Sequence, residues 1–156
     1  MFESPIQFLF TDAIGSFPSL ESHYYEIRSG AVSYNGALIL SPMAVYRGVT
    51  GHLLAVDDDL ETAFVKWYAP SGSYWLSLTS SNNTWTYTSG THMGKNISFS
   101  NWLPGHPVNS SDLCADFDAP SGRWLENSCA ASLPFIIEFE CGAGYVFNDT
   151  GCTGLR

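Results

Sequence analysis

Apolar and polar residues alternate with a period of two over much of the chain after Ser73. One face of a predicted strand carries Tyr74, Leu76 and Leu78, and the other face carries Trp75, Ser77 and Thr79. The same alternation predicts further strands at Trp85 and Tyr87, at Leu113, Ala115 and Phe117, and at Phe135, Ile137 and Phe139, where Glu138 and Glu140 face away.

One segment has the period of a helix instead. Leu60, Ala63, Phe64 and Trp67 follow the i, i+3, i+4, i+7 pattern, and Asp58 with Glu61 forms a capping box in front of them. The run of acids from Asp57 to Asp59 also suggests a metal site, but its spacing is not that of a calcium loop. Helix capping and the helix dipole explain these acids more simply.

The remaining segments complete an α+β domain with antiparallel sheets. Residues 1–21 have no clear period and are interpreted as a leader or linker. We expect a short strand over 23–27 that closes at Ser29-Gly30 and a strand over 51–56. The segment 32–46 suits a buried helix, but Pro42 should kink it or divide it into two short pieces. A long polar loop should join Gly90 to Asp112.

Composition and charge exclude two classes of partner. Hydrophobic residues make up 45% of the 156 residues and aromatic residues 15%, which is typical of a globular domain. Six Lys and Arg against fifteen Asp and Glu leave a net charge of −9, so the chain has no basic surface for nucleic acid. No apolar run approaches the ~20 residues of a membrane span.

Cysteines and glycosylation sequons together favour an oxidising, extracellular setting. The four cysteines show neither a Cys-x-x-Cys nor a zinc-finger spacing. Four acceptor sequons for N-glycosylation begin at Asn82, Asn96, Asn109 and Asn148. The first five residues lack the features of a signal peptide, so we expect either a removed signal or a piece of a longer protein.

The order of these landmarks resembles that of a C-type lectin-like domain, over Tyr24 to Glu140 and with expected domain limits of 22–140. The residues that carry the resemblance are Gly51-His52-Leu53, Glu61 and Phe64 in the helix, Trp75-Leu76-Ser77-Leu78, Trp85, Asn101-Trp102 with Pro104-Gly105, Cys114, Trp124, Cys129 and Pro134-Phe135-Ile136-Ile137-Glu138. The resemblance implies two short antiparallel sheets, two helices and a long ligand loop.

The resemblance also implies one family disulfide, Cys114–Cys129, which closes a ~15-residue loop worth about 3 kcal/mol. The family's other disulfide, from the first helix to the last strand, is expected to be missing because Ile137 occupies the place of its second cysteine. Residues 141–156 resemble the truncated start of an EGF-like or other cysteine-rich module. A simple Cys141–Cys152 bridge is the alternative for the last two cysteines.

The calcium and sugar site of the family is where the chain departs most. Sugar-binding members use Glu-Pro-Asn or Gln-Pro-Asp in the long loop and Asn-Asp after the strand Trp. The matching residues here are His106-Pro107-Val108 and Leu125-Glu126, and Asp112 matches an acidic ligand position. Only Asp112 and Glu126 retain a carboxylate, and Ca²⁺ needs six to eight oxygens. A shift in register would bring in Asn109 or Asn127.

Three other features have a simple structural interpretation beside a functional one. His106 is interpreted as an exposed loop histidine rather than a pH-sensitive contact, and His52 as a structural hydrogen-bond partner. Trp85, Tyr87 and Trp102 could form a ligand surface, but in this fold such aromatics more often fill the core.

The leading hypothesis is a non-enzymatic extracellular recognition or adhesion module that binds a protein or glycan with weak or no calcium dependence. The alternative is a calcium-dependent lectin that uses Asp112 and Glu126. No motif of an enzyme is present. Asp116 and Asp118 point the same way in a strand, but a solvated sheet edge explains them more simply than acid–base chemistry. A structural spacer without any ligand is a further hypothesis.

Overall fold

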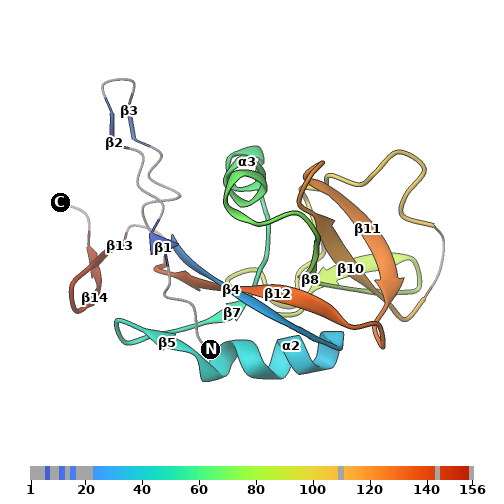
Figure 1. Ribbon diagram of the computed structural model, residues 1–156, viewed down its shortest axis with the longest axis horizontal. Helices are drawn as coiled ribbons and strands as arrows, with labels where there is room; N and C mark the ends of the chain where they lie inside the picture. The colour runs from blue at the N-terminus through green and yellow to red at the C-terminus, as the bar shows by residue number, and fades with distance from the viewer. Residues whose placement is uncertain are drawn as a thin grey trace.

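The computed structural model describes residues 6–7, 11–12, 15–16, 23–108, 111–142 and 145–154 (Figure 1). Within these ranges, two α-helices and a 3-10 turn accompany the strands: α2 (Tyr34–Leu40), η1 (Ser41–Met43) and α3 (Asp59–Tyr68). The strands are β1 (Ile6–Gln7), β2 (Thr11–Asp12), β3 (Gly15–Ser16), β4 (His23–Val32), β5 (Val45–Tyr46), β6 (Val49–Thr50), β7 (His52–Leu53), β8 (Ser73–Ser81), β9 (Thr84–Tyr87), β10 (Leu113–Asp118), β11 (Arg123–Ser128), β12 (Leu133–Glu140), β13 (Tyr145–Asn148) and β14 (Gly151–Gly154). No helix in the described ranges is long and apolar enough to cross a bilayer.

The main sheet has eight strands in a branched order. Its path is β1-β4-β12-β8-β10-β11, with β7 paired to β12 and β9 paired to β8. All pairs are antiparallel except a short parallel contact between β12 and β8, at Phe135 and Trp75. This contact joins the two antiparallel sheets that the resemblance implies, and the α+β fold class is confirmed.

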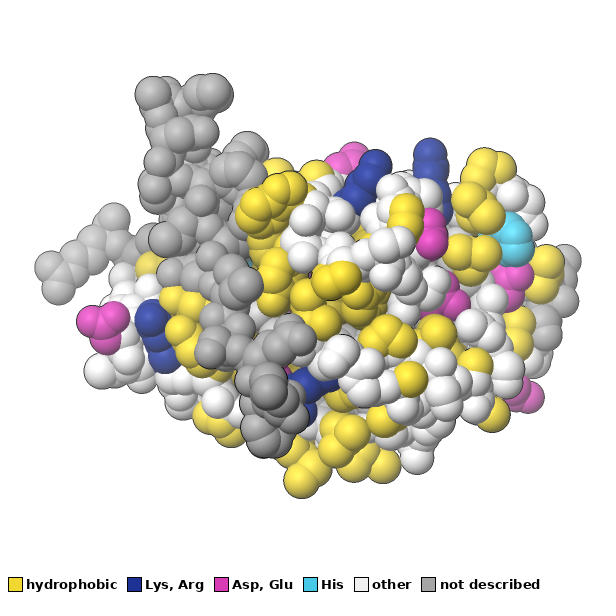
Figure 2. All heavy atoms as spheres, in the orientation of Figure 1, with side chains coloured by type: hydrophobic (Ala, Val, Ile, Leu, Met, Phe, Trp, Pro, Cys, Tyr) yellow, Lys and Arg dark blue, Asp and Glu magenta, His cyan; other side chains and the backbone are white. Residues whose placement is uncertain are grey.

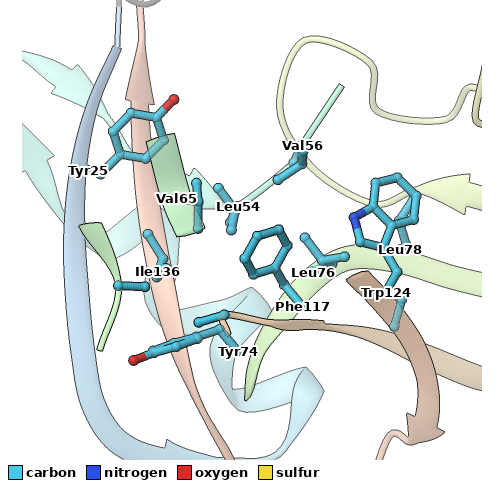
Figure 3. Close-up of a cluster of buried hydrophobic side chains, with 14 of the residues drawn as sticks. Tyr25, Leu54, Val56, Val65, Tyr74, Leu76, Leu78, Phe117, Trp124 and Ile136 are labelled. Atoms are coloured by element: carbon cyan, nitrogen blue, oxygen red, sulfur yellow. The ribbon is translucent and has the colours of Figure 1, made fainter. Parts of the chain in front are cut away.

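The two helices cover opposite sides of β4 and β12 (Figure 1), and each covers its own apolar core. Because side chains alternate along a strand, Leu76 of β8 faces the α3 side while Trp75 faces the α2 side. Figure 3 shows the α3-side core, which includes Phe117, Trp124 and Ile136. Both faces of β12 are therefore buried, and Glu138, which was expected to face away from the apolar residues, lies in the protein interior with 1% of its surface exposed.

Helix α3 begins as predicted but buries a different face. The Asp58 carboxylate accepts a hydrogen bond from the Glu61 backbone N–H (2.7 Å), which confirms the cap. The buried residues are Glu61, Phe64 and Val65, whereas Ala63 is exposed and Trp67 is 75% exposed. The predicted apolar stripe is confirmed at Leu60 and Phe64 but was wrong at Ala63 and Trp67. The Glu61 carboxylate turns inward instead and accepts a hydrogen bond from the Tyr25 hydroxyl (2.9 Å).

Element boundaries differ from the prediction at two strands. Strand β4 continues through Gly30 to Val32, because β12 pairs with it over nearly its whole length. The strand expected over 51–56 is confined to His52–Leu53. Beyond it, the Leu54 N–H donates to the Ile136 carbonyl (3.0 Å) and the Leu54 carbonyl accepts from Ser77 (2.8 Å), so this segment bridges two strands. The helix expected within 32–46 does break at Pro42, which lies in the 3-10 turn.

The described parts of the two segments that were expected to lie outside the lectin-like domain, 1–21 and 141–156, both contact that domain. Within the expected leader, β1 pairs with Tyr24 and Tyr25 of β4. Cys141 and Cys152 form a disulfide that joins the end of the β12 segment to the β13–β14 hairpin. The Phe147 ring of this hairpin packs edge-on against Tyr24 at 4.7 Å. The Cys141–Cys152 bridge, which was the alternative for the last two cysteines, is confirmed. The interpretation of residues 141–156 as the start of an EGF-like module stays a prediction.

Candidate ligand-binding surface

The long loop between β9 and β10 is attached to the sheet at two places. Its first half folds back on β9, where the Ile97 N–H donates to the Trp85 carbonyl (3.1 Å) and Gly94 N–H to the Tyr87 carbonyl (2.9 Å). Its second half runs beside β11, where the Leu103 N–H donates to the Trp124 carbonyl (2.9 Å). These backbone hydrogen bonds attach the described part of the loop to β9 and β11.

The aromatic residues of this region belong to the core. Trp85 and Tyr87 are buried, and the half-buried Trp102 ring lies 4.8 Å from Trp85 and 5.4 Å from Trp124. The prediction that they fill the core is confirmed, and the structure offers no sugar-stacking platform at Trp85 or Tyr87.

His106 and Glu126 are brought together. The His106 Nδ1 atom lies 2.7 Å and 2.9 Å from the two carboxylate oxygens of Glu126. The histidine side chain is 28% exposed and the glutamate 9%, so His106 is not the free loop histidine that was expected. A cis peptide bond joins His106 to Pro107, and the Val108 side chain beyond it is exposed.

Asp116 and Asn127 form a second polar pair. The Asn127 side-chain amide donates to the Asp116 carboxylate (3.0 Å), and Asp116 is only 4% exposed. Burial raises the pKa of Asp116 to about 6, against the opposing hydrogen bond from Asn127, and the charges of Asp118 and Glu126 add to the rise. The expectation that Asp116 lies on a solvated edge was wrong, because β8 and β11 flank β10 on both sides.

The expected calcium ligands do not converge. Asp112 is exposed, with φ of 61°, and its N–H donates to the Ser80 carbonyl (3.2 Å). In the described part of the chain, side chains that could bind a metal gather in threes at two places, and neither includes Asp112 or Glu126. Asn109 lies outside the described residues. A set with one imidazole, two apolar side chains and a glutamate already paired to that imidazole does not fit the all-oxygen shell of Ca²⁺.

A buried polar cluster that the sequence did not reveal lies between β4, β7, α3 and β12. We call it the His23 cluster. The shortest contacts of His23 are from Nδ1 to the Tyr25 hydroxyl (2.9 Å) and to Glu138 (3.1 Å), and from Nε2 to Glu140 (3.5 Å). His52 donates its Nε2 proton to the other Glu140 oxygen (2.6 Å), which confirms the structural role expected for His52. The members of the cluster are His23, Tyr25, His52, Glu61, Glu138 and Glu140.

Three members of the His23 cluster, Glu138, His23 and Glu140, have shifted pKa values. Burial, together with the charges of Glu61 and Glu140, raises the pKa of Glu138 well above its ordinary value. Burial lowers the pKa of His23, but the contact with Glu61 and the charge of Glu140 outweigh burial, so this pKa is raised. For Glu140 the hydrogen bond from His52 outweighs burial and lowers the pKa. The sequence signal was the two-residue spacing of His23 with Tyr25 and of Glu138 with Glu140 in strands that pair with each other.

The chain belongs to the C-type lectin domain family, whose model matches residues 47–139. Among curated proteins it is similar to human asialoglycoprotein receptor 2, at 26% identity over 94 residues, which are 56% of this chain and 29% of that protein. The chain thus spans about a third of the length of this relative.

Solved structures share the fold. The mouse scavenger receptor C-type lectin carbohydrate-recognition domain has a TM-score of 0.65 and 21% identity, over 78% of this chain and 91% of that chain. A calcium-independent type II antifreeze protein has a TM-score of 0.65 and 18% identity, over 90% of this chain and 96% of that chain.

Proposed function

We propose that this chain is a non-enzymatic recognition module of an extracellular or cell-surface protein, which binds a protein or glycan through its long loop with weak or no dependence on calcium. The side chains that we assign to this surface are His106 and Glu126. The further candidates are Asn127, which follows Glu126 in sequence, and Asn109 and Asp112, which follow His106 in the loop. Adhesion is the broader role that such a module would serve.

The observation that carries the proposal is the His106–Glu126 pair. The family's loop acid and strand acid are matched here by an imidazole and a carboxylate that bind each other at 2.7 Å. Val108 and Leu125, at the remaining matched positions, bring no oxygen donor. In this pair the His106 ring supplies the polar partner of the Glu126 carboxylate. Two carboxylates at the same positions would repel each other and would need a cation between them.

The backbone attachment of the loop also supports a ligand surface that needs no ion. Hydrogen bonds to Trp85, Tyr87 and Trp124 order both halves of the loop before any ligand arrives, which lowers the entropic cost of binding. The antifreeze protein with the same fold is described as calcium-independent, so this fold exists without such a requirement.

Secretion, glycosylation and a multidomain host protein are part of the same proposal. Both disulfides suit an oxidising compartment. Asn82, Asn96 and Asn148 are exposed and therefore accessible for N-glycosylation. The 141–156 segment would open a further cysteine-rich module, and the apolar packing of Ile137 would replace the absent helix-to-strand disulfide. Expression in a secretory host with peptide N-glycosidase digestion tests the sequons, since an unchanged mass would exclude their use.

A calcium-dependent lectin that uses Asp112 and Glu126 is the second candidate. The relative named asialoglycoprotein receptor 2 and the mouse carbohydrate-recognition domain favour a glycan ligand. Asp112 is exposed and hence free to move toward an ion, but Glu126 would have to leave His106 first.

A thermal melt in millimolar Ca²⁺ against EDTA separates the two candidates. We expect no change in Tm for the natural sequence. The combined variant His106→Glu, Val108→Asn, Leu125→Asn restores the family's oxygen donors, and its Tm should rise by about 5 to 10 °C at a calcium concentration near 100 Kd. A rise of that size in the natural sequence would overturn the calcium-independent proposal and make glycan arrays, read with and without EDTA, the next experiment.

A further inference from the structure

The His23 cluster concentrates acidic groups where water is scarce. Glu61 and Glu138 each have 1% of their surface exposed, and the ion pairs of Glu61, Glu138 and Glu140 among the described residues are all to histidines. Buried charge of one sign is costly unless a counter-charge offsets it.

Three of these side chains present donor atoms to a common point. One atom each from His23, Glu138 and Glu140 lies within 4.8 Å of the other two. The shortest contacts run from opposite nitrogens of the His23 ring, 3.1 Å from Nδ1 to Glu138 Oε2 and 3.5 Å from Nε2 to Glu140 Oε2. Ligands at 2.0 to 2.1 Å from a tetrahedral ion are separated by roughly 3.3 Å, and a single imidazole nitrogen binds the ion. One carboxylate must therefore rotate toward the ring nitrogen that the other carboxylate already contacts.

We propose that His23, Glu138 and Glu140 bind one divalent transition-metal ion of the Zn²⁺ type. An imidazole with two carboxylates is a donor set that Zn²⁺ accepts, whereas Ca²⁺ takes oxygen ligands alone. The ion brings two positive charges to this group of carboxylates.

His52 acts as a positioning residue for this site. Its Nε2 atom contacts the Glu140 oxygen that does not face His23 (2.6 Å), and its Nδ1 atom contacts the Leu53 carbonyl (2.8 Å). Both contacts fix the orientation of Glu140 from outside the ligand set, as outer-shell partners of metal ligands do. The ion has a route of entry, because the side chains of His23 and Glu140 keep 13% and 14% of their area exposed.

The site would also order the base of the long loop. The Thr91 N–H donates to the same Glu140 oxygen that His52 contacts (3.4 Å). A Cβ atom at Gly90 would lie 2.9 Å from the His52 ring, and Gly90 has a φ of +81°, so the loop begins in close contact with the cluster. This role is separate from the proposed ligand surface at His106 and stands or falls independently of it.

The test is titration of the chelator-treated chain with ZnCl₂, read by isothermal calorimetry, by metal analysis after gel filtration and by Tm. We expect one Zn²⁺ per chain and a rise in Tm of about 5 to 10 °C at a zinc concentration near 100 Kd. His23→Gln should abolish both effects, and His52→Gln should weaken zinc affinity by about 10- to 100-fold without changing the stoichiometry. His92→Gln is the matched control, since His92 pairs with Asp57 away from the ligand set and should leave zinc binding unchanged.

Three results would overturn the proposal. They are no binding of Zn²⁺, equal binding by His23→Gln, or an equal response to CaCl₂. If His23→Gln fails to fold, Glu140→Gln keeps the side-chain shape while removing one charge, and undiminished zinc affinity in that variant would be equally fatal. In each of these cases the side chains of the His23 cluster bind one another and do not form a zinc site.

Discussion

The clearest quantitative prediction concerns Asp116, a carboxyl group that the fold buries against its preference. The pKa of this group is about 6 in the folded protein and 3.8 in its ordinary environment, mainly because of burial. The folded state therefore binds the proton more tightly than the unfolded state does. Stability contributed by this group is fully present below pH 3.8 and is lost as the pH rises through 6.

The size of this penalty follows from the difference between the two pKa values. Each tenfold change in proton affinity is worth about 1.4 kcal/mol, which gives an upper limit of about 3 kcal/mol. Screening by solvent near the outer strand β11 reduces it, and we expect about 1 to 2 kcal/mol. Asp116→Asn cannot ionise and still offers an oxygen to the Asn127 amide, so this variant should be more stable than the natural sequence at pH 7.5 by that amount.

Urea unfolding followed by tryptophan fluorescence, at several pH values between 4 and 7.5, measures the effect. The two proteins should have similar free energies of unfolding near pH 4, diverge between pH 4 and 6, and keep a constant difference above pH 6. Asp149→Asn, at an exposed position, is the control for the loss of one negative charge and should differ by less than about 0.5 kcal/mol throughout. Parallel pH profiles would refute the reasoning, because they would mean that folding does not change the pKa of Asp116. A less stable Asp116→Asn at pH 7.5 would also refute it, because it would mean that the ionised carboxylate stabilises the folded protein.

Two further predictions test the packing. Gly51→Ala should destabilise the domain by about 2 to 3 kcal/mol in chemical denaturation, because its Cβ would lie 2.4 Å from Ile137 Cγ2, whereas Gly30→Ala, with nothing within 4 Å, should leave stability nearly unchanged. Replacing both Cys114 and Cys129 by Ser should cost about 3 kcal/mol by the same assay, and a cost below about 1 kcal/mol would mean that the unfolded chain is not restrained by this bridge.

Local patterns in the sequence were enough to predict the strands and the helix start. The alternation at Tyr74, Leu76 and Leu78 specifies one buried face, and Asp58 specifies a cap, because both signals lie within a few residues. The buried face of the helix was less well determined, because two apolar stripes share Phe64. The stripe that runs on to Trp67 and the stripe that includes Val65 are offset by one residue along the helix. Only the contact between Glu61 and Tyr25, 36 residues apart, decides between them.

The polar sites depend on strand pairing that no local pattern specifies. The register of β4 with β12 sets Tyr25 opposite Glu138 and His23 opposite Glu140. A shift by one residue would set Tyr25 opposite Ile137 and His23 opposite Phe139, and the period-two alternation of the sequence would be compatible with either register. The resemblance did place His106 and Glu126 at one site, but whether they would bind each other depended on the path of the loop.

The same register explains why the two halves of the long loop should respond differently to changes in the His23 cluster. The first half begins at Thr91 and Gly90, which contact Glu140 and His52, while the second half is attached to Trp124 of β11. We expect His52→Gln to increase amide hydrogen exchange at Gly94 and Lys95, which close the turn after Gly90.

Exchange at Leu103, whose N–H donates to Trp124, should stay as in the natural sequence and serves as the internal control. Equal acceleration in both halves would contradict this division, because it would mean that the loop opens as one unit. Faster exchange confined to the first half would instead establish that the cluster orders the base of the loop, while the surface around His106 is ordered by β11.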